Sequence, residues 1–93
     1  MPKADPRLEP IATFCRTRGG IMLRKTGRGY SLFSTRTGGP IARLRPTGEA
    51  DEMQVLWWNG ERWATPGDFG PVIMPLKRAL GYIVSEPAFW IHA

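Results

Sequence analysis

The feature that most constrains the fold is an Asn-Gly pair, Asn59-Gly60, between two tryptophan-rich runs. The stretch 53–64 has the sequence Met-Gln-Val-Leu-Trp-Trp-Asn-Gly-Glu-Arg-Trp-Ala. A two-residue type I′ turn needs positive φ at both central positions, and Asn and Gly tolerate this better than other residues. The pattern therefore predicts a β-hairpin whose loop is Asn59-Gly60.

This turn also predicts the hairpin's register and its two faces. The expected cross-strand pairs are Trp58 with Glu61, Trp57 with Arg62, Leu56 with Trp63 and Val55 with Ala64. Trp57 opposite Arg62 would form a cation–π pair. Because both faces are apolar, we expect the hairpin at the centre of a sheet. We expect the Leu56/Trp63 face to point toward the main core, with Trp57 under a helix, a loop or a partner.

Length and composition indicate one folded domain. A chain of 93 residues with 42% hydrophobic residues is long enough to bury one core without metal or disulfide. Residues 1–8, with two prolines, are predicted to be a flexible N-terminus, and 9–93 a single domain. The lone Cys15, the lack of a signal-peptide pattern and the lack of an apolar run of about 20 residues predict a cytoplasmic protein without a membrane partner.

The order of the expected elements along the chain predicts an α+β fold with a meander of about five antiparallel strands. The expected elements are an N-terminal helix from Glu9 or Pro10 to Arg18, strands near 21–25, 30–36 and 41–45, the hairpin, a C-terminal helix over 75–84, and a short terminal extended segment beginning at Phe89. Ile21 and Leu23 are expected to face inward. On the next strand, the pattern allows either Phe33 or the Tyr30/Leu32 pair to do so.

Charge is distributed unevenly along the chain. The first 46 residues hold ten Lys/Arg and two Asp/Glu, a balance of +8, whereas the remainder holds three and six, a balance of −3. Such asymmetry bears on association and steering and not on fold. The basic half is suited to an anionic polymer or to the acidic half of a second copy.

No catalytic or cofactor pattern is present. The one histidine, His92, is penultimate, and Cys15 lies on the apolar side of the first helix, so no acid–base or nucleophilic constellation is indicated. Scattered carboxylates show no metal-ligand spacing. The glycines at 27 and 29 join two strands and do not open a helix, so they do not predict a phosphate loop. We therefore expect a non-enzymatic protein without cofactor or metal.

A nucleic-acid site is one hypothesis. The candidate phosphate-contact residues are Arg24, Arg43 and Arg45 on one predicted sheet face, with Arg28 and Arg36 at its rim. Tyr30 or Trp57 is the candidate for base stacking. A solvated strand face, whose arginine stems cover apolar surface, explains the same pattern without a ligand.

Protein–protein association, including homodimerisation, is the second hypothesis and the one that the sequence favours by a small margin. Four tryptophans are difficult to bury in so small a domain, and an aromatic patch with an arginine beside it has the composition of an interface. Trp57 and Arg62 are the candidate interaction surface. The partner would be a second copy or another protein, with nucleic acid as the alternative.

The chain also resembles a small bacterial domain-of-unknown-function family. The segments that carry the resemblance are Pro-Ile-Ala-Arg-Leu-Arg at 40–45, Val-Leu-Trp-Trp at 55–58, Arg-Trp at 62–63 and Phe-Trp at 89–90. The family has an aromatic residue where this chain has Pro46, and a basic residue or histidine where it has Ala64. The resemblance implies a helix, a meander with a Trp-rich hairpin, a second helix and a Phe-Trp end. It implies no known activity; the sequence as a whole predicts a small non-enzymatic bacterial accessory domain.

Overall fold

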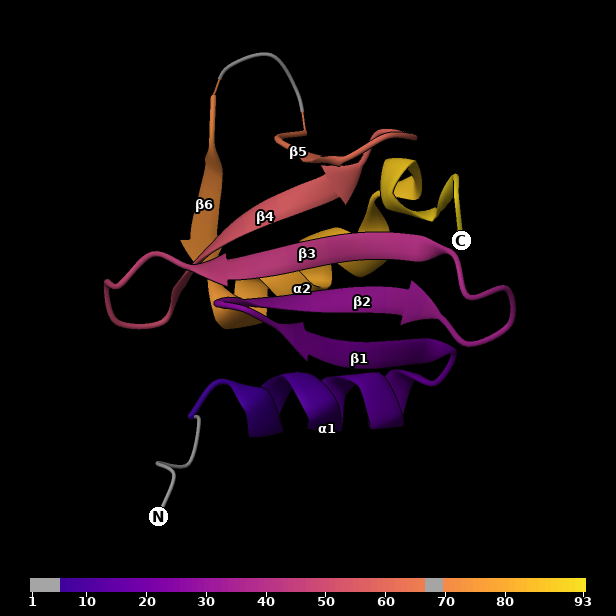
Figure 1. The fold of residues 1–93 in the computed structure, drawn as a ribbon. Helices are drawn as coiled ribbons and strands as arrows, with labels where there is room; N and C mark the ends of the chain where they lie inside the picture. The colour runs from indigo at the N-terminus through magenta and orange to yellow at the C-terminus, as the bar shows by residue number, and fades with distance from the viewer. Residues whose placement is uncertain (1–5, 67–69) are drawn as a thin grey trace.

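The computed structural model describes residues 6–66 and 70–93, and they form the predicted α+β fold (Figure 1). The elements are α1 (Leu8–Arg18), β1 (Ile21–Thr26), β2 (Gly29–Ser34), β3 (Pro40–Pro46), β4 (Glu52–Trp58), β5 (Trp63–Ala64), β6 (Val72–Pro75), α2 (Leu76–Ser85) and the 3₁₀ helix η1 (Pro87–Trp90). The helix α1 begins at Leu8, one residue before the predicted start and inside the segment expected to be flexible.

The strands form one antiparallel sheet in the order β1-β2-β3-β4-β5, and β6 also pairs with β4. The strand β4 is the organising element, because β3 takes one of its edges and two short strands share the other. β5 pairs with the end of β4, and β6 pairs with its beginning. The strand β6 was not predicted, since its four residues follow a Pro- and Gly-rich segment and give no clear alternation. The sequence also predicts that Phe69 anchors the Pro- and Gly-rich loop 65–71, and this residue lies outside the described ranges.

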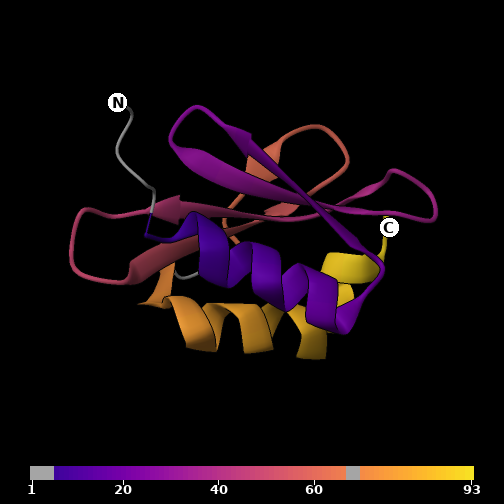
Figure 2. The same ribbon diagram turned by 90° about the horizontal axis from the view of Figure 1, so that it is seen from below.

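Both helices cover the same face of the sheet, which we call the inner face (Figure 2). The α2 residues with the helical spacing i, i+3, i+4 and i+7 are all buried: Leu76, Ala79, Leu80 and Ile83. They pack in one cluster with strand residues such as Leu32 and Val55, which are both 0% exposed. Tyr30 and Leu32, and not Phe33, are therefore the inward pair on β2.

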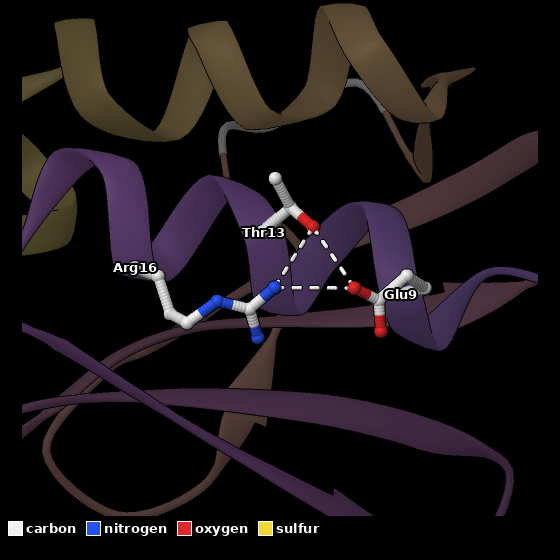
Figure 3. Close-up of polar contacts among 3 residues, drawn as sticks. All are labelled: Glu9, Thr13 and Arg16. Carbon is white, nitrogen blue, oxygen red and sulfur yellow. Dashed lines mark hydrogen bonds and ion pairs between the residues drawn. The ribbon is translucent and has the colours of Figure 1, made fainter.

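The helix α1 is amphipathic and holds its own polar face together. Ile11 and Cys15 are buried against the sheet. On the opposite side, Thr13 Oγ1 donates to Glu9 Oε1 at 3.2 Å, and Arg16 Nη2 donates to the same carboxylate oxygen at 3.1 Å (Figure 3). The Glu9 carboxylate thus forms an ion pair with Arg16. Because both side chains are exposed, this pair contributes only modestly to stability.

The predicted hairpin is present, but the predicted register is wrong: the observed pairing is shifted from it by two residues. Trp58 pairs with Trp63 and Trp57 with Ala64, so that the loop spans the four residues 59–62. Trp57 is therefore not opposite Arg62.

The turn residue Asn59 explains this difference. A type I′ turn would place both central residues at positive φ, and only Gly60, at 104°, is there. The Asn59 side chain instead accepts hydrogen bonds through Oδ1 from the backbone N–H groups of Glu61 and Arg62, at 2.9 and 3.0 Å. Its backbone N–H donates to the Arg62 carbonyl at 3.1 Å. These bonds stabilise a wider loop of the Asx type.

The assignment of the hairpin's two faces is also wrong. Because the register shift is even, the same residues still share a face, but the faces are exchanged. Met53 and Val55 are 0% exposed within the core, and Trp57 packs against that core. Leu56, Trp58 and Trp63 lie on the opposite side of the sheet, away from the helices.

The end of the described chain is helical and not extended. Residues Pro87–Trp90 form η1, in which Phe89 is 2% exposed. The rings of Phe89 and Tyr82 meet edge-on, with their centroids 5.2 Å apart. Trp90 Nε1 donates to the Ile83 carbonyl at 3.0 Å. Following η1, the His92 carbonyl lies so close to Gly39 that a Cβ added there would clash with it. The C-terminal residues therefore pack on the β2–β3 loop.

Candidate functional site: the outer face of the sheet

The outer face of the sheet, opposite α1 and α2, is covered by no helix among the described residues (Figure 2). Its central row is fixed by register: Arg24 pairs with Ser31, Ser31 with Arg43, and Arg43 with Leu56. Side chains of directly opposite residues point to the same side of a sheet. Two arginines from different strands therefore share this row.

The five predicted phosphate-contact arginines are distributed as expected. Arg43 and Arg45 alternate with the buried Ala42 and Leu44 along β3, so both project from the outer face. Arg24 and Arg45 are exposed, and Arg43 is half-buried. Arg28 and Arg36 lie in the β1–β2 and β2–β3 turns, at opposite ends of β2, and both are exposed.

Arg43 is held by the protein itself. Its Nη1 donates to Thr26 Oγ1 at 2.6 Å and to Ser31 Oγ at 2.7 Å, and its Nη2 donates to the Thr26 carbonyl at 2.9 Å. A Cβ added at Gly29 would be 2.6 Å from the guanidinium, so the side chain lies directly over this glycine. Arg43 thereby ties β3 to the end of the β1–β2 hairpin.

These acceptors are neutral, so they leave the charge of Arg43 uncompensated. Desolvation, and secondarily the neighbouring charge of Arg45, lowers the pKa of Arg43. Arginine nevertheless remains protonated in proteins. Among residues 6–66 and 70–93, neither Arg24, Arg43 nor Arg45 lies within 4.0 Å of a carboxylate oxygen. The outer face therefore carries three positive charges that have no ion-pair partner within the described ranges.

An aromatic cluster, Phe33, Trp58 and Trp63, lies beside these arginines on the same face. The Trp58 and Trp63 ring centroids are 5.3 Å apart with an interplanar angle of 76°, and those of Phe33 and Trp63 are 6.4 Å apart at 69°. The guanidinium of Arg24 lies 5.7 Å from the centroid of Phe33. All three rings are partly exposed. The cluster and the arginines thus form one continuous surface.

The aromatic residues proposed from the sequence are elsewhere. Tyr30 is 2% exposed within the core, and Trp57 packs against the core on the inner face, so neither is placed for base stacking. Arg62 is exposed in the hairpin loop and is not opposite Trp57. Because the hairpin faces are the reverse of the prediction, Trp58 and Trp63 belong to the candidate site. Correct face assignment would have identified them from the sequence.

Acidic residues border this surface at one end. Glu52 lies on the outer face beyond Arg45, where it accepts a hydrogen bond from Thr47 Oγ1 at 3.3 Å. Glu49 and Asp51 are exposed in the loop that precedes β4. The positive region therefore extends from the aromatic cluster to Arg45 and ends at this loop.

An apolar hollow lies on the other side of the molecule. It is an apolar groove of about 660 Å³ between α1 and the beginning of α2, with Phe14, Leu76 and Leu80 among its walls and Lys77 and Asp51 at its polar edge. The sequence analysis did not predict it, because a groove between two helices depends on their separation. It shares no residue with the outer face.

Two further kinds of group, the one cysteine and the potential metal ligands, are placed by the part of the chain that the structure describes. Cys15 is 5% exposed, and burial raises the pKa of its thiol despite the opposing effect of Arg16, so the nucleophilic thiolate is disfavoured. Within the described ranges, no three His, Cys, Asp or Glu residues are grouped to hold a metal ion. No described helix is long and apolar enough to span a bilayer.

Comparison of the chain with protein-family models, with curated proteins and with solved structures gave no match. The resemblance to a small bacterial family stays a prediction. Function is therefore inferred from the geometry of the chain itself.

Proposed function

We propose that this protein binds nucleic acid through the outer face of its sheet. The observation that carries the proposal is the arrangement of Arg24, Arg43 and Arg45 on a face that no described helix covers and where no described carboxylate pairs with them. Cations so placed attract phosphates and release the counterions around them, which is the main source of affinity in non-specific binding.

The three arginines have different roles in this proposal. Arg24 and Arg45 are exposed and make direct phosphate contacts, assisted by Arg28 at the end of the β1–β2 hairpin. Arg43 has three of its donor contacts engaged by Thr26 and Ser31. It supplies positive potential and fixes the hairpin that carries Arg28.

Geometry weakens the hypothesis of protein association through Trp57. That hypothesis required Trp57 on an uncovered face beside Arg62, whereas Trp57 packs against the core. Self-association through the outer face is also disfavoured. A two-fold interface places the same patch of both copies in contact, and here it would bring the arginines of both copies together.

The test is a titration of labelled oligonucleotides, followed by fluorescence anisotropy at several salt concentrations. We expect dissociation constants in the micromolar range or weaker at physiological salt, and an affinity that falls steeply as salt rises. The variant R24A/R45A should bind on the order of tenfold more weakly at low salt, and its salt slope should be smaller by roughly 2.

The matched control is K77A/R78A, which removes the same charge from the exposed side of α2. Its affinity should stay close to that of the unchanged protein. An equal loss in both variants would indicate attraction to net charge and not to this face. Polyglutamate that competes as well as an oligonucleotide of equal charge would instead identify an acidic protein as the partner.

A further inference from the structure

We propose that the ligand of the outer face is a single strand, whose bases stack on the aromatic cluster Phe33, Trp58 and Trp63 while its phosphates follow the arginines. This inference rests on the proposed function, and a different observation carries it. Duplex binding through phosphates requires cations only. Among nucleic-acid ligands, aromatic rings beside the cations add affinity only where bases are accessible for stacking.

The position of the cluster supports this assignment. Met22 pairs with Phe33 at one end of the β1–β2 ladder, and Trp58 pairs with Trp63 at the corresponding end of β4. Arg24 is two residues along β1 from Met22, and Arg45 lies farther toward the opposite end of the sheet. A nucleic-acid strand that runs along the direction of the β-strands therefore contacts the rings at one end of the sheet and the arginines along the rest of it.

Ring geometry supports it as well. Trp58 and Trp63 meet at 76°, and Phe33 and Trp63 at 69°, so neither pair is stacked face to face. Every base has a π-face, so such a platform accepts bases with little regard to sequence. The guanidinium of Arg24 lies over one face of the Phe33 ring, 5.7 Å from its centroid, so Trp58 and Trp63 are the main stacking rings and Arg24 lies beside them for the phosphate.

The experiment compares strands that differ only in their bases. An oligothymidine strand and an abasic strand with the same number of phosphates are titrated at the same salt concentration, together with a duplex. We expect the base-bearing strand to bind at least tenfold more tightly than the abasic strand. Its binding should also quench tryptophan fluorescence, whereas the abasic strand should leave the fluorescence unchanged.

Two variants assign the effect to residues. W58L should lose on the order of tenfold in affinity for oligothymidine and nothing for the abasic strand, and retained abasic binding shows that the variant is folded. W57F, on the inner face, is the control and should behave as the unchanged protein. W63L provides a second test of the cluster.

The outcomes separate this inference from the proposed function. Equal, salt-dependent affinity for oligothymidine, abasic strand and duplex would overturn the single-strand inference and leave phosphate binding intact. A loss in W57F equal to that in W58L would also overturn it, because the effect would not belong to the outer face. Absence of binding to any of the three at low salt would remove both proposals.

Discussion

The contact between Arg43 and Gly29 gives a prediction at the scale of single residues. In the variant G29A the new methyl group would lie 2.6 Å from the guanidinium, which must then leave its acceptors on Thr26 and Ser31. Because Arg43 is half-buried and water replaces part of what is lost, we expect the free energy of unfolding to fall by about 1 kcal/mol. Urea denaturation measures this change.

A double-mutant cycle identifies the cause. In the R43A background the guanidinium is absent. Adding G29A there should leave the free energy of unfolding unchanged or raise it by roughly 0.4–1 kcal/mol, because alanine reduces the entropy of the unfolded chain. The two substitutions are therefore expected to be coupled. If G29A has the same cost in both backgrounds, the guanidinium does not lie over Gly29 in solution.

Residue-scale features of the candidate site were partly accessible from the sequence. Alternation along β3 correctly places Arg43 and Arg45 on one face of the sheet and the buried Ala42 and Leu44 on the other, because a period of two follows from strand geometry. The hydrogen bonds of Arg43 to Thr26 were not accessible. They join residues 17 positions apart and depend on how β3 aligns with the first hairpin.

Among the elements, the hairpin between β4 and β5 gives the clearest prediction. In N59A the backbone N–H groups of Glu61 and Arg62 lose their acceptor, Oδ1 of Asn59. The side chain acts much as a helix N-cap does, so we expect a loss of about 1 kcal/mol in the free energy of unfolding. N59D keeps the oxygen acceptor and should cost less. Equal losses in N59A and N59D would show that these hydrogen bonds do not stabilise the loop.

The same element shows why hairpin sequence patterns have limits. The Asn-Gly pair correctly predicts that the chain reverses between Trp58 and Trp63. It does not decide between Asn at positive φ and Asn accepting hydrogen bonds, since both suit this residue. Which apolar face of the hairpin meets the core is decided by α1 and α2. A pattern internal to the hairpin therefore cannot assign the faces.

At the scale of the whole molecule, the open face follows from where the helices are. The helices α1 and α2 cover one side of the sheet, and helical periodicity identifies their buried faces, as Leu80 and Ile83 illustrate. Periodicity does not say whether two helices lie on one face or on opposite faces. That choice decides that Trp57 is covered and that the outer face, with its arginines, is not.

This arrangement predicts a monomer at low salt. The Cα radius of gyration of 12.5 Å is that of a compact single chain, close to the roughly 12 Å expected for its length. Association through the outer face would oppose Arg24 and Arg45 with their counterparts, and low salt leaves that repulsion least screened. Small-angle X-ray scattering should therefore give a radius that does not change with protein concentration. A radius that grows with concentration at low salt would show that a second copy binds despite these charges. The same growth in R24A/R45A would place that interface elsewhere on the molecule.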